Sequence, residues 1–184
     1  MKISAEDQEV IDLLKRVALQ GAEAFVAIYP DNVSKLSRDA AYFRDPCEGL
    51  ISSALDAKSY EEATLYLRAY ADHGVAVALP NAIALSKIAA RALELAIEAE
   101  DEEVFALATT KLNPGEEAEF DFLFKIACWY AMRSERPQML KAIVRVLDSY
   151  DVGPSTFTKE SSFSAFKKDP DFKLAIRGNY KLKK

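Results

Sequence analysis

Residues 81–99 read NAIALSKIAARALELAIEA, and this stretch indicates the fold class. Its apolar side chains recur every three or four positions, the spacing that places them on one face of an α-helix. Alanine and leucine make up most of that face, and both favour helix over sheet. No stretch of the sequence alternates with the period of two that a half-buried strand requires. We therefore expect an all-α chain. The apolar positions are Ile83, Leu85, Ile88, Ala89, Ala92, Leu93, Leu95 and Ala96.

Start and stop signals predict further helices before this stretch. Ser4, followed by two acids, begins a helix that we expect to end near Tyr29, because Pro30 interrupts it. Asn32 or Ser34 then begins a second helix. The remaining signals are the Asp45–Pro46 step, which begins a third helix, the break at 56–59, the cap Ser59, and His73–Gly74, which ends the helix after Ser59.

Helix signals continue beyond residue 99. Asp101 begins a short helix that closes at 113–115, a long helix covers 116–133, and Pro137 begins the next. Ala and Leu dominate the apolar residues of the chain, which favours helix over sheet.

Three of the predicted short helices recur at a nearly constant interval. Ala63, Val104 and Leu140 hold equivalent positions in their first turns, 41 and 36 residues apart, near the period of stacked helix pairs. Each pair would bury one face against the next. We expect one domain, with N-terminal helices over 1–58, helix pairs over 59–152, and a cap and basic tail over 153–184. An irregular helical bundle is the alternative.

The stretch 120–180 resembles a tetratricopeptide-like terminal unit found in many bacterial proteins. The core of its first helix is residues 127–131, Ala-Cys-Trp-Tyr-Ala, and its second helix is 139–147. The Asp-Pro-Asp-Phe run at 169–172 is similar to the tail that closes such units. The resemblance implies a right-handed stack of antiparallel helix pairs, a tetratricopeptide-like α-solenoid, that binds other proteins.

The tail also has a physical role that does not depend on this resemblance. The last helix pair of a stack exposes an apolar edge, which must be covered. Phe157, Phe163, Phe166 and Phe172 supply apolar surface for that purpose, while the lysines between them face water. We therefore expect a C-terminal cap.

Few residues in the chain are suited to catalysis. His73 is the single histidine, and no glycine-rich phosphate loop is present. Cys47 and Cys128 lie far apart in the sequence, and we expect both to be small buried side chains. We expect no enzyme, no metal and no cofactor. The alternative is an enzyme with a carboxylate-only site, formed by Glu94 and Glu98 on one helical face.

Charge is the more informative feature. Ten acids and one base, Lys111, lie between Glu94 and Asp121, a local charge of about −9. Acids at helix starts also offset the positive end of the helix dipole, so a purely structural role is the alternative. The candidate partner-binding residues are Glu94, Glu98, Asp101, Glu102, Glu103, Glu116, Glu117, Glu119 and Asp121.

The other end of the chain is basic, with eleven bases and five acids from Arg136 onward. Because the net charge is −5 and no recognition motif appears, we expect no nucleic-acid partner. No apolar run reaches the roughly 18 residues of a membrane span, and the charged N-terminus does not resemble a secretion signal. We expect a cytoplasmic protein without a membrane partner.

These features favour a non-catalytic protein-protein interaction module. The most specific hypothesis is a bacterial immunity-type inhibitor, whose acidic surface covers a basic toxin domain. The alternative is an adaptor or chaperone that holds a peptide or helix in its concave face. Its candidate groove contacts are Tyr66, Tyr70, Trp129 and Tyr130, which could equally belong to the core.

Overall fold

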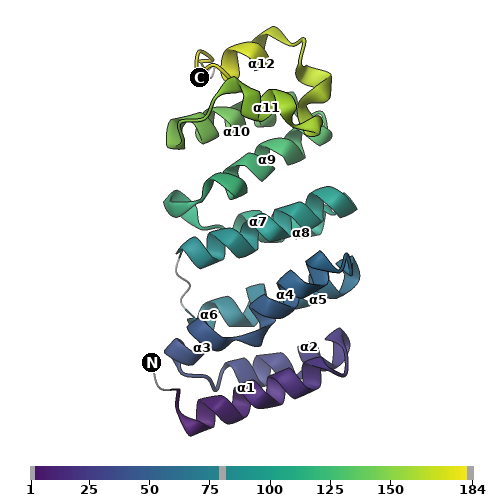
Figure 1. The fold of residues 1–184 in the computed structure, drawn as a ribbon, viewed down its shortest axis with the longest axis vertical. Coiled ribbons are helices and arrows are strands. Elements are labelled where there is room, and N and C mark those ends of the chain that lie inside the picture. Colours follow the sequence, from purple (N-terminus) through teal and green to yellow (C-terminus); the bar gives the residue numbers. More distant parts are fainter. Residues whose placement is uncertain (1–2, 79–81, 182–184) are drawn as a thin grey trace.

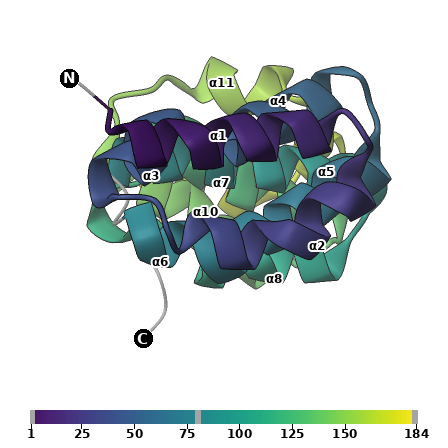
Figure 2. The ribbon, with the colours of Figure 1, turned by 90° about the horizontal axis from the view of Figure 1, so that it is seen from below.

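The computed structural model describes residues 3–78 and 82–181, and throughout these ranges the chain is helical, without strands. Groups of helices follow one another along the long axis, from α1 and α2 at one end, through α3 to α6 and then α7 and α8, to α11 and α12 at the other (Figure 1). Seen along that axis, α1, α4 and α11 lie on one side and α2, α6 and α8 on the other (Figure 2). The α-helices are α1 Ala5–Ala18, α2 Ala22–Val33, α3 Arg38–Arg44, α4 Pro46–Asp56, α5 Tyr60–Ala69, α6 Val75–Ala78, α7 Ala82–Ala99, α8 Glu102–Thr110, α9 Phe120–Met132, α10 Arg136–Ser149, α11 Pro154–Lys159 and α12 Pro170–Ala175.

Capping residues explain where several of these helices begin. The Ser4 hydroxyl accepts a hydrogen bond from the Asp7 backbone N–H, and Asp45 accepts one from the Cys47 backbone N–H. Asp101 caps α8 in the same way. The predicted starts at Ser4, Asp45–Pro46 and Asp101 are thus confirmed.

The predicted end of the first helix at Pro30 is wrong. The chain breaks earlier, at Gly21, whose φ of 112° lies outside the range that other residues readily adopt. Pro30 instead lies inside α2, in its final turn. The predicted start at Asn32 or Ser34 is also wrong, because α2 ends at Val33 and the Ser37 hydroxyl caps α3.

Gly74 does not end the helix that contains Tyr70. The chain continues from α5 through one π-helical turn, η1 Tyr70–Gly74, directly into α6. Gly74 is required by close packing, since a Cβ atom there would overlap the Tyr29 hydroxyl and lie 2.7 Å from Cδ2 of Tyr70. His73 in the same turn is exposed.

The C-terminal half follows the predicted order with one shift. Residues Gly115–Glu117 form a separate 3-10 turn, η2, so α9 begins at Phe120 instead of residue 116. Helix α7 packs against both α8 and α9, and α9 packs lengthwise against α10. These contacts place α8, α9 and α10 around a common surface.

The aromatic tail is buried against this half of the molecule. Phe157, Phe163, Phe166 and Phe172 are all buried, and the segment η3 Ser161–Phe166 packs on α9. Arg136 at the start of α10 holds α12 through two hydrogen bonds to Asp169, at 2.6 and 3.0 Å, and one to Asp171 at 2.6 Å. The segment that follows α10 is therefore part of the packed structure up to Tyr180.

Candidate functional site

A groove of about 510 Å³ lies where the end of α8 meets the α9–α10 pair. Leu123, Ile126 and Tyr130 form one stripe of α9 along it, at the three- and four-residue spacing of a helix face. Ala142 and Val144 contribute from α10. Ile126, Tyr130 and Val144 remain half-exposed, so the groove has an apolar floor that water can reach. We call these residues the α8–α10 groove.

Polar and charged residues surround this floor unevenly. On the α8 side, the Thr109 hydroxyl donates to the Phe105 carbonyl and the Asn113 amide donates to the Thr109 carbonyl, so both serve the local chain. On α10, Lys141 and Arg145 are exposed and lie one turn apart. Neither forms an ion pair with any residue that the structure describes. The α10 edge of the groove is therefore cationic.

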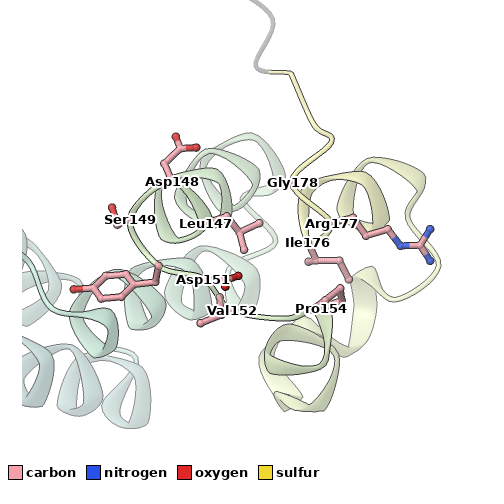
Figure 3. Close-up of a pocket in the computed structure, with 10 residues that line it drawn as sticks. Leu147, Asp148, Ser149, Asp151, Val152, Pro154, Ile176, Arg177 and Gly178 are labelled. Carbon is pink, nitrogen blue, oxygen red and sulfur yellow. The ribbon is translucent and has the colours of Figure 1, made fainter.

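A second hollow of about 550 Å³ adjoins the groove, and Asp148 lines both. It lies between the end of α10 and the C-terminal segment, with Leu147, Val152 and Ile176 among its lining residues. Figure 3 shows the Asp148 carboxylate and the Arg177 guanidinium pointing away from each other. These two groups therefore do not form an ion pair across the hollow.

Four of the acids predicted to bind a partner already contact other parts of this chain. Glu102 pairs with Arg133 of α9, and Glu103 with Arg68 of α5 at 2.6 Å. Glu98 accepts a hydrogen bond from the Tyr60 hydroxyl, and Glu94 pairs with Arg91 at 3.1 Å. Exposed ion pairs such as these contribute roughly 0–1 kcal/mol each to the stability of the fold.

The acidic residues also fall into two groups. The Glu119 backbone N–H donates to the Ser86 hydroxyl near the start of α7, whereas residues 98–103 lie at the other end of that helix. The fourteen positions from 86 to 100 separate the groups by about 21 Å. Asp101 serves as a cap, Glu116 and Asp121 are exposed, and the side chain of Glu117 lies outside the described residues. The cluster is not one continuous patch.

The four candidate aromatic contacts have different surroundings. Tyr66, Tyr70 and Trp129 are 5%, 1% and 3% exposed, so they offer almost no surface to a ligand. The Trp129 ring stacks on Phe105, and the Tyr70 hydroxyl donates to Glu48. Tyr130 alone of the four lines the α8–α10 groove.

Sequence reasoning missed Ile126 and Val144 as groove residues, although α9 contains a signal for Ile126. Its sequence, FDFLFKIACWYAM, is apolar on nearly every face, whereas a helix with one buried face needs a single stripe. Helix α9 packs on α7, α10 and η3, and these contacts leave Ile126 half-exposed in the groove.

Away from the groove, a buried network joins Tyr29, Asp45 and Cys47 with the neighbouring pair of Glu48 and Tyr70. The Tyr29 hydroxyl donates to Asp45, whose other oxygen accepts from the Cys47 backbone N–H at 2.9 Å. Burial raises the pKa of Asp45 to about 6, and the two hydrogen bonds offset only part of this effect. Burial likewise raises the pKa of Glu48, although the Tyr70 hydroxyl donates to it at 2.8 Å.

We expect Asp45→Asn to remove a destabilising effect that develops as pH rises. The folded state favours neutral Asp45, so the contribution of this residue to stability is fully present below about pH 4. That contribution is lost as pH rises through about 6. A shift from 3.8 to about 6 corresponds to about 3 kcal/mol of unfolding free energy. Urea unfolding at pH 4 and pH 7 should show the variant gaining stability relative to wild type by about this amount at the higher pH.

Asp31→Asn is the matched control for this experiment, because Asp31 is exposed at the end of α2. Asparagine at position 45 still accepts the backbone hydrogen bond that begins α4. If the difference in stability between Asp45→Asn and wild type were the same at pH 4 and pH 7, the expectation would be contradicted.

No group of three or more His, Cys, Asp or Glu side chains suited to a metal ion occurs within the described ranges. None of the helices in this part of the chain is long and apolar enough to cross a membrane. Comparison with models of known protein families, with curated proteins and with solved structures found no match.

Proposed function

We propose that this chain is a non-catalytic module that binds another protein in the α8–α10 groove. The observation that carries this proposal is the half-exposed apolar floor formed by Ile126, Tyr130 and Val144. Apolar surface shared by neighbouring helices and bordered by charge is typical of protein-binding sites. The groove also has the elongated form that a partner segment occupies, because its α10 side spans residues 138–148.

The proposal includes the finer architecture expected from the sequence. The pairs α4–α5, α7–α8 and α9–α10 each pack closely, which supports a right-handed, tetratricopeptide-like stack of antiparallel helix pairs. The buried phenylalanines of the tail support a C-terminal cap on the last pair. Cys47 and Cys128 are free and buried, in keeping with a bacterial cytoplasmic protein.

Site-specific photo-crosslinking tests the groove. A benzophenone amino acid at position 126 or 144 should form one discrete adduct in the organism that encodes the chain, because these side chains would contact the partner. The same probe at Leu19, which is 89% exposed and directly follows α1 at the opposite end of the fold (Figure 1), should not form that adduct. Absence of adducts from both groove positions would refute the proposed site.

The purified partner then permits a quantitative measurement. Val144→Glu should weaken its binding at least tenfold, since the interface would bury an unpaired charge. Leu19→Glu introduces the same charged side chain outside the groove and should leave the affinity unchanged. Circular dichroism and urea unfolding of both variants verify that the fold is retained.

A second candidate keeps the same class of function but uses the acidic residues. In that case the chain is an immunity-type inhibitor that masks a basic toxin domain, and electrostatic attraction speeds their encounter. The observation in its favour is that Glu100, Glu116 and Asp121 are exposed and lack ion-pair partners among the described residues.

Charge reversal distinguishes this candidate from groove binding. Replacing Glu100, Glu116 and Asp121 by lysine should slow association with a basic partner by about tenfold at low salt, with a smaller effect at high salt. Val144→Glu should leave that association rate unchanged. If the three charge reversals left the association rate unchanged, binding through the acidic residues would be ruled out.

A further inference from the structure

We infer that the occupant of the α8–α10 groove is an amphipathic α-helix of a partner protein, with acidic side chains one turn apart beside its apolar stripe. This inference rests on the proposed binding function and specifies the chemistry of the partner. It draws on three properties of the groove: the polar groups that are already occupied, the placement of charge along α10, and the length of the floor.

Occupied polar groups favour a helix over an extended peptide. An extended segment brings backbone N–H and C=O groups that need partners when they are buried. Thr109 and Asn113 on the α8 side hydrogen-bond to their own chain, and the described residues provide no strand edge. A helix satisfies its backbone internally and needs only apolar contacts from the floor.

The charges along α10 specify the polar side of that helix. Lys141 and Arg145 are separated by four residues, so both face the same edge of the groove. One Arg145 nitrogen donates to the Gly115 carbonyl at 3.2 Å, which orients the guanidinium while its charge remains unpaired. Asp148 lies a further turn along and leaves a net charge of +1 on the lining. Acidic side chains at i and i+4 of the partner helix match the two cations.

The length of the floor sets the size of the occupant. From Gln138 to Asp148 the lining residues of α10 extend over ten positions, about 15 Å. This length holds about three helical turns. Leu123, Ile126 and Tyr130 in the floor match apolar residues spaced at i, i+3 or i+4, and i+7 on the occupant.

Fluorescence anisotropy with designed peptides tests the inference. The first probe is a 16-residue stapled helix with a leucine stripe and two glutamates at i and i+4 beside it. The second carries lysine in place of both glutamates, and the third is unstapled with a central proline. We expect the glutamate helix to bind about tenfold more tightly than the lysine helix and at least tenfold more tightly than the proline peptide.

Charge exchange on the protein provides the matched control. The double variant Lys141→Glu, Arg145→Glu should reverse the preference between the glutamate and lysine helices. Lys167→Glu with Lys168→Glu makes the same charge change in the exposed segment before α12 and should leave the preference unchanged. Reversal of this preference in the Lys141→Glu, Arg145→Glu variant alone would confirm that the α10 cations determine which helix the groove binds.

Other outcomes overturn the inference in distinguishable ways. Equal binding of the two stapled helices refutes the acidic partner, and tighter binding of the proline peptide refutes the helix. Groove crosslinks to a partner without binding of any designed helix leave the proposed function intact and refute this inference alone. Self-association in sedimentation that Lys141→Glu with Arg145→Glu abolishes would assign the groove to a second copy of the chain. Absence of both crosslinks and peptide binding refutes the two proposals together.

Discussion

Gly74→Ala is expected to destabilise the fold by about 1–3 kcal/mol, although alanine is the better helix former. The new methyl group would overlap the Tyr29 hydroxyl and lie 2.7 Å from the Tyr70 ring. Neither tyrosine moves freely, because Tyr29 is fully buried and bonded to Asp45, and Tyr70 is bonded to Glu48. Urea unfolding followed by the fluorescence of the single tryptophan, Trp129, measures the loss.

Gly49→Ala is the control for this substitution. Gly49 lies inside α4, and a Cβ atom there meets nothing within 4 Å. The same chemical change should therefore stabilise the protein by about 0.5–1 kcal/mol, since alanine loses less conformational freedom on folding. If the two Gly→Ala substitutions changed the free energy of unfolding in opposite directions, packing against Tyr29 and Tyr70 would be shown to require Gly74. A Gly74→Ala variant as stable as wild type would contradict the observed packing.

Phe163→Ala should cost about 3–5 kcal/mol of unfolding free energy. The Phe163 ring is fully buried and lies within 6.0 Å, centroid to centroid, of the rings of Phe124, Phe157 and Phe172. Its removal leaves a cavity between the tail and α9 that the surrounding rings cannot fill. The urea midpoint should fall, and proteolysis after residue 160 should become faster.

Lys167→Ala controls for a general effect of mutating the tail. Lys167 is exposed directly after η3, so its replacement should change stability by less than about 0.5 kcal/mol. If Phe163→Ala left the unfolding midpoint of Trp129 fluorescence unchanged, the tail would unfold separately from α9, and the proposed cap would be wrong.

The helix content was predictable because it depends on local chemistry. Hydrophobic periodicity and capping side chains act within a few residues, which explains why Ser4, Asp45 and Asp101 were recognised as helix starts. The prediction failed where a distant contact decides the conformation. Gly74 resembled a helix end, yet the chain continues from α5 through η1 into α6, and glycine is required there by a contact with Tyr29, 45 residues earlier in the sequence.

The candidate site was predictable only in part, for a related reason. The count of acids is a property of the sequence, but the pairing of Glu103 with Arg68 and of Glu102 with Arg133 depends on which helices meet. In the same way, Tyr130 could be identified as a surface candidate, whereas Ile126 and Val144 line a common groove only when α10 packs beside α9.

Residues 81–99, with the similar patterns around them, were sufficient to assign an all-α chain, since helix formation requires only neighbours three and four positions apart. Which apolar residues remain half-exposed depends on long-range packing. Helix α9 is apolar on nearly every face, and its contacts with α7, α10 and η3 leave Ile126 and Tyr130 half-exposed in the α8–α10 groove. That stripe depends on tertiary packing because burial is a relation between helices distant in sequence.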